Sequence, residues 1–134
     1  MEWLEKHKHD YERYALGVSK LKPEQALQIA VVRWIDAQLP HVRPLMFASA
    51  GGLFTSKKQG YLMKRAGYRK GTPDLFFAIP KPPYFGLWIE VKTEKGTVSR
   101  EQKECVELLR EQGYQASVEK GWKNITQVIL EYFE

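Results

Sequence analysis

The chain has 134 residues, of which 43% are apolar and 28% charged, so its composition is that of one globular domain rather than a disordered or repetitive chain. Its 21 Lys and Arg against 16 Asp and Glu give a formal charge of +5, which is compatible with a polyanionic partner. The single cysteine excludes a disulfide framework, and no apolar run suits a signal peptide or a membrane span, so we expect a cytoplasmic protein without a membrane partner.

The first 18 residues predict a helical segment outside the main domain, which we place at 19–134. An apolar stripe follows helical spacing along this segment: Trp3, Leu4, Tyr11 and Tyr14. We expect the stripe to serve as a dimer interface, and the alternative is a helix that folds back on its own chain.

The stretch "SKLKPEQALQIAVVRWIDAQLP" predicts the first long helix, which begins near Pro23 and ends before Pro40. Its buried face is expected to hold four large side chains: Leu27, Val31, Trp34 and Ile35. Glu24 and Gln28 fall on that same face by helical spacing. The helix dipole alone explains an acid in the first turn, so the helix by itself leaves the role of Glu24 open.

The next stretch, "HVRPLMFASAGG", predicts a strand that ends in a Gly51-Gly52 turn. A basic run with a short helix ending at Gly67 is expected after it. Six cations gather there, directly before Asp74: Lys57, Lys58, Lys64, Arg65, Arg69 and Lys70. Such a run is either a solvated face or a surface that contacts a polyanion.

Two short apolar runs, 75–79 and 86–91, predict the strands of a hairpin joined by "PKPPYF". If the loop centres near its adjacent prolines, Asp74 falls opposite Glu90 or Val91. Glu90 and Lys92 are two apart in a strand, so they share one face at a spacing of about 7 Å.

Carboxylates that converge at one edge of a sheet repel each other unless a cation neutralises them. A divalent ion with oxygen ligands does this, and a neighbouring lysine stabilises charge that develops on a phosphoryl oxygen. Asp74, Glu90 and Lys92 therefore suit phosphodiester hydrolysis. The plainer interpretation is a surface Glu90–Lys92 ion pair beside a turn aspartate, because isolated Glu-x-Lys triplets are common.

The stretch "VSREQKECVELLREQGY" predicts a second long helix. Ser99 is its expected N-cap, Gln102 completes a capping box, and Gly113 suits the position after the C-cap. Cys105, Val106 and Leu109 are expected to pack inward. A strand over "YQASVEK" and a closing helix over "NITQVILEYFE" follow, so the order of elements predicts an α/β domain whose mixed central sheet is flanked by helices.

The order of these motifs resembles that of the VRR-NUC branch of the PD-(D/E)xK nuclease superfamily. The resemblance rests on "EQALQ", "KRAGYRKGTPD", and "WIEVKTEKGTVSREQKECVELLREQGYQASVEKG", and it covers residues 23 to about 122. It implies a restriction-endonuclease-like fold and makes residues 19–134 a VRR-NUC-like nuclease domain.

The resemblance also implies a role for each matching residue. Asp74, Glu90 and the Val91 carbonyl would bind Mg²⁺ or Mn²⁺, with Glu24 as a further ligand, while Lys92 would assist catalysis. Gln102 resembles the family's active-site glutamine, supported by Gln28 and Ser99. We expect the capping role and the site role of Gln102 to compete, because a side chain that caps its own helix would not also face a metal.

The implied activity is a metal-dependent, structure-selective endonuclease that hydrolyses branched DNA such as Holliday junctions. A stand-alone domain of this size resembles viral and bacterial members that act as homodimers, so a viral protein acting in a bacterial cytoplasm is compatible with it. Two alternatives stay open: a non-catalytic basic module that binds DNA, and a nuclease of the flap or restriction type.

Overall fold

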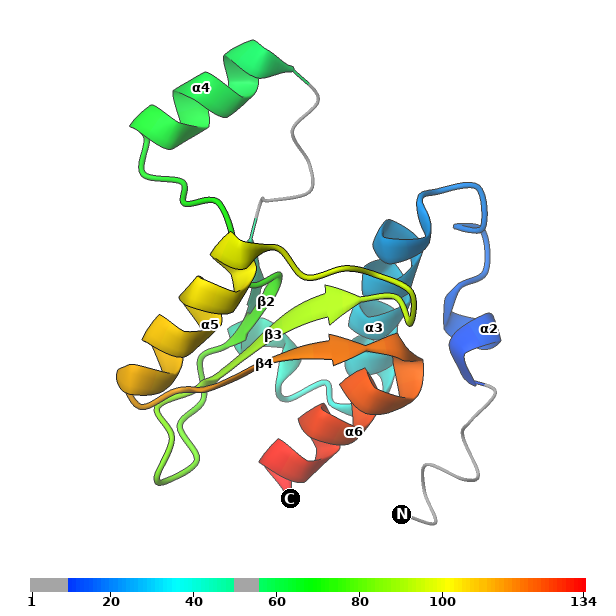
Figure 1. Cartoon of the computed structure of the whole chain (residues 1–134). Helices are drawn as coiled ribbons and strands as arrows, with labels where there is room; N and C mark the ends of the chain where they lie inside the picture. The colour runs from blue at the N-terminus through cyan, green and yellow to red at the C-terminus, as the bar shows by residue number, and fades with distance from the viewer. Residues whose placement is uncertain (1–9, 50–55) are drawn as a thin grey trace.

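The computed structural model describes residues 10–49 and 56–134 (Figure 1). The elements in chain order are α2 (Asp10–Tyr14), α3 (Pro23–Gln38), a 3-10 turn (Arg43–Leu45), β1 (Met46–Ala48), α4 (Lys57–Arg65), β2 (Leu75–Phe77), β3 (Leu87–Lys92), α5 (Arg100–Glu111), β4 (Gln115–Lys120) and α6 (Gly121–Phe133). Within the described residues, no helix is long and apolar enough to cross a membrane.

The four strands form one mixed sheet in the order β1-β2-β3-β4. β1 with β2, and β2 with β3, pair antiparallel, whereas β3 and β4 run parallel because α5 connects them as a crossover. This arrangement confirms the predicted α/β class with a mixed sheet between helices.

The main core lies between the sheet and the helices α3 and α6. It contains the four predicted α3 residues Leu27, Val31, Trp34 and Ile35, together with Leu75, Phe77, Leu87, Ile89 and Val91 from the strands and Ile125, Ile129 and Tyr132 from α6. The strand residues alternate, as expected when one face of a strand is buried against helices.

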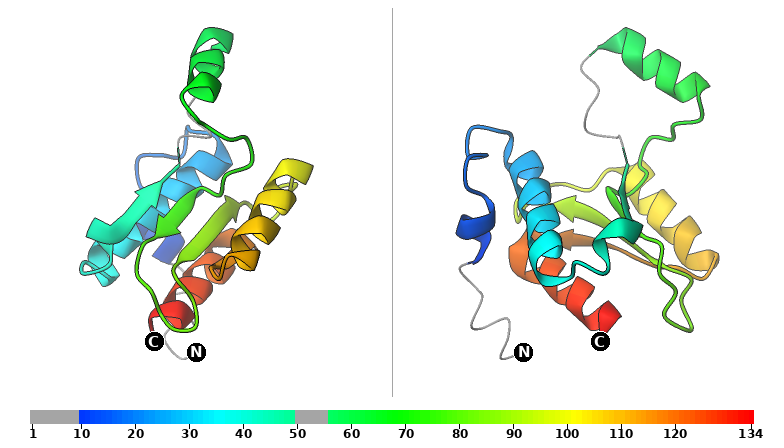
Figure 2. Two further views of the ribbon diagram at one scale, coloured as in Figure 1. Left: turned by 90° about the vertical axis from the view of Figure 1, so that its left-hand side faces the viewer. Right: turned by 180° about the vertical axis from the view of Figure 1, so that it is seen from behind.

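The opposite face of the sheet is covered by α5, and the left view of Figure 2 shows α3 and α5 on either side of the strands. Cys105 and Val106 of α5 are buried, as predicted. On this face Phe76 and Trp88 stack with their ring centroids 4.2 Å apart. Residues of β3 with even numbers, Glu90 among them, therefore face α5.

The ends of the second long helix and the tip of the hairpin lie where the sequence predicted them. Ser99 caps α5, and Gly113 adopts φ +95° directly after the C-cap, where a side chain would be strained. A bridge between Lys81 and Tyr84 places the Pro82-Pro83 pair, whose peptide bond is cis, at the tip of the hairpin.

The strand predicted over 41–52 is shorter than expected. It comprises Met46–Ala48, because Pro44 lacks an amide hydrogen and sits in a 3-10 turn instead. The Gly51-Gly52 turn lies outside the described residues. The strand predicted over 75–79 ends at Phe77, three residues before Pro80.

The described part of the N-terminal segment packs against its own chain. The rings of Tyr11 and Tyr14 lie 5.6 and 5.9 Å from that of Trp122. Arg33 Nη1 donates to the carbonyls of Tyr14 and Leu16 at 3.0 and 2.7 Å. Both tyrosines therefore have partners within the chain, while Trp3 and Leu4 of the predicted stripe lie outside the described residues.

Candidate active site

Asp74 stands at the start of β2, where two neighbouring strands hold it in place. Its Oδ2 accepts a hydrogen bond from the Val91 amide at 2.8 Å, and its carbonyl accepts one from the Ser49 amide at 2.8 Å. Leu75 pairs with Ile89, so the next position outward brings Asp74 opposite Glu90. The sequence prediction that these two acids converge is thus reproduced by the strand register.

Only glycine suits position 71, three residues before Asp74. It adopts φ +92°, and a Cβ there would lie 2.5 Å from the backbone carbonyl carbon and oxygen of Glu101. The chain before β2 therefore passes directly over the first turn of α5, which no other residue type would allow without displacement. This close approach brings Asp74 and α5 to the same end of the sheet.

Glu90 and Lys92 are both buried, with 2% and 7% of their surface exposed. Lys92 Nζ lies 3.8 Å from Glu90 Oε2 and 3.6 Å from Glu24 Oε1. Charged side chains are seldom buried this deeply unless they are paired. The surface ion pair that competed with a site at the sequence level is therefore excluded by burial.

Three carboxylates converge around this lysine. One ligand oxygen each from Glu24, Asp74 and Glu90 lies within 4.8 Å of the others. Glu24 reaches the cluster from the first turn of α3, which gives it a partner that the helix dipole alone would not require. The three acids against one lysine leave the cluster with an excess of negative charge.

Burial is the largest cause of a raised pKa at Glu90; together with the charge and hydrogen bond of Asp74, and with Lys92 offsetting part of the effect, it brings that pKa to about 9. Glu24 adds a smaller upward contribution. A carboxyl with so high a pKa ionises at neutral pH only if a further positive charge arrives. The donors and the electrostatics both fit a divalent cation.

The Gln102 side chain caps its own helix and also contacts Glu90, so the expectation that the cap would turn it away from the acid cluster is wrong. Its Oε1 accepts from the Ser99 amide at 2.9 Å, and the Ser99 hydroxyl accepts from the Gln102 amide at 3.2 Å, which completes the capping box. At the same time its Nε2 donates to Glu90 Oε2 at 3.2 Å. A primary amide accepts hydrogen bonds through its oxygen and donates them through its nitrogen. Because the cap holds the Gln102 oxygen, it also fixes the direction in which the nitrogen donates to Glu90.

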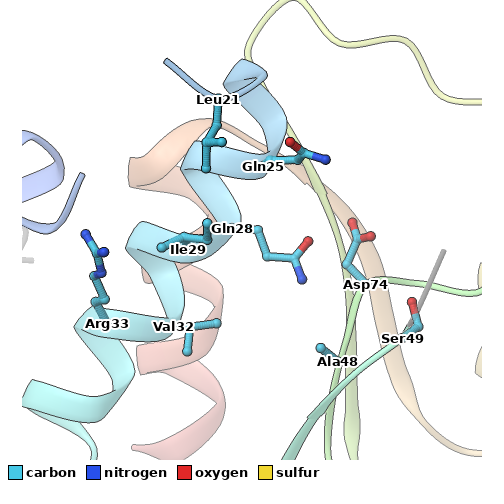
Figure 3. A pocket seen from close by; sticks show the side chains of 9 residues that line it. All are labelled: Leu21, Gln25, Gln28, Ile29, Val32, Arg33, Ala48, Ser49 and Asp74. Carbon is cyan, nitrogen blue, oxygen red and sulfur yellow. The ribbon is translucent and has the colours of Figure 1, made fainter. Parts of the chain in front are cut away.

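Gln28 lies on α3 beside the acid cluster. In Figure 3 its side chain extends from the helix toward the β1 side of a cavity that Asp74 also lines. Val91 contributes its amide to Asp74. Ser99, predicted as a supporting residue, contacts Gln102 through the capping box.

The six predicted DNA-binding cations are all exposed. Lys57, Lys58, Lys64 and Arg65 belong to α4, which stands apart from the sheet and its helices (Figure 1). Arg65 lies over the Tyr61 ring at 5.6 Å, and Lys70 Nζ is 3.8 Å from Glu101 Oε1. The structure thus separates the basic helix from the acid cluster, although the two are close in sequence.

Sequence reasoning missed Tyr68, which lies near the acid cluster. Burial raises the pKa of its phenol, and the charges of Asp74 and Glu90 raise it further. Its place in "AGYRKGTPD", directly before the close approach at Gly71, is the sequence signal that would have pointed to it.

Comparison with known proteins identifies one family. A family model described as VRR-NUC domain matches residues 19–122. A solved structure named "VRR_NUC domain protein" is 31% identical, with a TM-score of 0.73, and the match covers 84% of this chain and 89% of that one. No curated protein sequence matches the chain.

Proposed function

This chain belongs to the VRR-NUC domain family, and on that premise we propose that it is a metal-dependent, structure-selective endonuclease acting on branched DNA. The observation that carries the proposal is the convergence of Glu24, Asp74 and buried Glu90, with the buried Lys92 ammonium paired to Glu24 and Glu90. A structural ion pair needs one acid for one base, whereas this cluster keeps three carboxylates around one lysine at a considerable electrostatic cost.

The donor set fits Mg²⁺ or Mn²⁺. Asp74, Glu90 and Glu24 would hold the ion through carboxylate oxygens, the ligand type these ions prefer, and the Val91 carbonyl is proposed as a further ligand. When bound, such an ion polarises the scissile phosphate and lowers the pKa of water. The same ion would lower the raised pKa of Glu90, so that the carboxylate form is the one present in the active protein.

The remaining residues have separate tasks in this proposal. The Lys92 ammonium, held between Glu24 and Glu90, would stabilise the negative charge that grows on the phosphoryl oxygens. Gln102 Nε2 fixes one oxygen of Glu90, so the other oxygen keeps a defined direction. The Val91 amide does the same for Asp74. Both acids are therefore oriented before any substrate arrives.

DNA binding would use α4 and the loop that follows it. The exposed cations there suit phosphate contacts, which supply sequence-independent affinity. Because α4 stands apart from the body, it would reach a DNA arm that does not lie over the acid cluster (Figure 1).

We further propose that the working unit is a homodimer, because a four-way junction has two-fold related strands and paired incision needs two related active sites. Tyr11 and Tyr14 contact Trp122 of their own chain, so the interface is better sought elsewhere. Tyr61 and Leu62 on α4 are 61% and 50% exposed, which makes α4 the first surface to test. Light scattering should show a dimer that Leu62→Asp converts to a monomer; a monomeric wild type that makes paired cuts would refute the proposal.

The test of activity is a cleavage panel under Mg²⁺, Mn²⁺ and EDTA. The substrates are a four-way junction, a flap, a duplex and a single strand of matched sequence. We expect cleavage of the junction in both metals and none in EDTA. Equal cleavage of all four substrates would refute structure selectivity, and binding without cleavage in either metal would favour a non-catalytic DNA-binding module.

A further inference from the structure

We propose that the cavity between α3 and β1 receives an unpaired nucleobase of the DNA strand that is cut. The inference rests on the proposed function and adds to it a binding site for one substrate base. It explains how a domain of this size could prefer branched DNA without reading a sequence.

The cavity has a volume of about 410 Å³ and lies directly beside the candidate active site. Its lining includes Asp74, whose carboxylate belongs to the acid cluster. Figure 3 shows α3 on one side of the cavity, and Ala48 and Ser49 on the other. Volumes of this order hold small organic ligands in protein pockets, and a single base with its sugar is such a ligand.

The walls of the cavity are mostly apolar. Leu21, Ile29 and Val32 line it from the α3 side, and Ala48 lines it from β1. A flat heterocycle presents two apolar faces, so it would gain contact with these side chains on leaving water.

Polar groups in the lining suit the edge of a base. Gln25 and Gln28 each carry a hydrogen-bond donor and an acceptor, so the pair could meet the edge of any of the four bases. Ser49 Oγ is buried and makes no hydrogen bond to the described residues. That oxygen is closed to solvent, so the polar contacts of a base in this cavity would come from the two glutamines.

The charge of the lining favours a neutral occupant over a phosphate. Its cation, Arg33, already donates from Nη1 to the carbonyls of Tyr14 and Leu16, while Asp74 contributes a negative charge. A neutral ring is therefore preferred to an anion in this cavity. The phosphate of the same nucleotide would lie outside it, toward the cluster of Asp74 and Glu90.

The position next to Asp74 links the cavity to the cleavage step. A base and its phosphate are joined through one sugar, so a base held here would fix the register of the neighbouring phosphodiester over the acids. Removing a base from a duplex stack costs a few kcal/mol, and the cost is least where pairing is already interrupted. Branch points and single-stranded ends would therefore enter the site more readily than continuous duplex.

The experiment uses 2-aminopurine, whose fluorescence rises when it leaves the base stack. It is placed in turn at each position flanking the cut in a four-way junction, and wild-type protein in Mg²⁺ is mixed with it by stopped flow. We expect a fluorescence rise that precedes cleavage at one position next to the scissile phosphate, and no rise at positions further along the arms.

Two variants and a matched control complete the test. Ala48→Phe fills the cavity, and Gln25→Leu removes a polar contact without changing the shape of the wall. Phe47→Trp enlarges the neighbouring residue, which is 55% exposed and points to the other face of β1, where its pair partner is Phe76. We expect Ala48→Phe to abolish the fluorescence rise and to increase KM by about tenfold or more. Gln25→Leu should reduce the size of the fluorescence rise, and the control should behave as wild type.

The outcomes distinguish failure of the proposed base site from failure of the proposed nuclease activity. Cleavage without a rise at any position, or a rise that Ala48→Phe leaves unchanged, would overturn the base site while the proposed function stands. A rise that Ala48→Phe abolishes, in a protein that cleaves nothing in Mg²⁺ or Mn²⁺, would support the base site and overturn the nuclease.

Discussion

In the proposed function, the acid cluster and α4 would contact DNA in opposite ways. Glu90 and Lys92 are buried in a strand, and Gln102 and the Val91 amide hold the orientation of the acids. In α4, Lys57–Arg65, no residue is buried, and the helix stands away from the sheet (Figure 1). Catalysis requires fixed distances between reacting groups, and a packed sheet supplies them. Phosphate contacts require only that positive charge lies near the DNA backbone.

The largest expected effect tests whether the acid cluster is the site of chemistry. Lys92→Met keeps the length of the side chain and removes its charge, and we expect it to lower single-turnover cleavage by about 10²–10³-fold or more. Asp74→Asn and Glu90→Gln should do the same. The matched control is Lys103→Met on the exposed face of α5.

Binding and folding must be followed beside the rate in these variants. Junction affinity by fluorescence anisotropy should stay close to wild type, and thermal melting should show that each variant is still folded at the assay temperature. A Lys92→Met protein that cuts at the wild-type rate would remove Lys92 from the chemistry and return the cluster to a structural role.

The second test separates packing from chemistry on a single helix. Leu27 is 4% exposed and lies in the core, so Leu27→Ala should cost about 2–5 kcal/mol in the free energy of unfolding. Glu24→Ala, one turn earlier, should cost far less stability while it weakens cleavage and shifts the metal requirement upward. Urea denaturation and a Mg²⁺ titration of cleavage measure both. Equal losses of stability in the two variants would make Glu24 a structural residue.

The raised pKa of Glu90 predicts that the stability of the folded protein depends on pH. Because the pKa is about 9 in the folded, metal-free protein and near 4.5 in the unfolded chain, the folded state binds more protons between these values. The stability that the group contributes is present in full below about pH 4.5 and is lost as the pH rises through about 9.

We therefore expect the metal-free protein to lose several kcal/mol of stability across this range from Glu90 alone, and about 6 kcal/mol at most for a shift from 4.5 to about 9. Glu90→Gln should flatten the dependence, and exposed Glu107→Gln, the control, should not. Mg²⁺ should stabilise the wild type more at pH 8 than at pH 6, because fewer protons then compete with the ion. Chemical denaturation in EDTA and in Mg²⁺ measures both, and an unchanged slope in Glu90→Gln would contradict the electrostatic account.

The smallest expected effect concerns α4. Replacing Lys57, Lys58 and Lys64 by Gln should weaken binding to all DNA sequences alike, by about tenfold, and should reduce the slope of log affinity against log salt by nearly three. Cleavage at saturating protein should be unaffected. The control replaces exposed Lys20, Lys103 and Lys123. An affinity that the α4 variant leaves unchanged at two salt concentrations would reduce this run to a solvated face.

The sequence predicted the hairpin and its acids because local rules fix them. The Pro-Pro loop sets the register, and the register places Asp74 against Glu90. The two roles of Gln102 were mispredicted, because helical spacing assigns a side chain to one face and does not say where each amide atom points.

Other features depend on contacts between distant parts of the chain. The packing of Tyr11 and Tyr14 on Trp122 joins residues more than a hundred positions apart, and no local pattern in the N-terminal segment indicates it. The separation of α4 from the sheet was likewise unpredictable, because a basic amphipathic run has the same sequence whether it is docked or exposed.

The most direct test of the account follows cleavage and metal binding together. Mn²⁺ is titrated into wild-type protein, and ion binding by electron paramagnetic resonance is compared with the rate of junction cleavage at each concentration. The account predicts that both rise over the same concentration range, and that Asp74→Asn and Glu90→Gln lose both while Glu107→Gln keeps both. Cleavage that persists in EDTA, or in either variant at the wild-type rate, would contradict the assignment of the acid cluster as the metal-dependent active site.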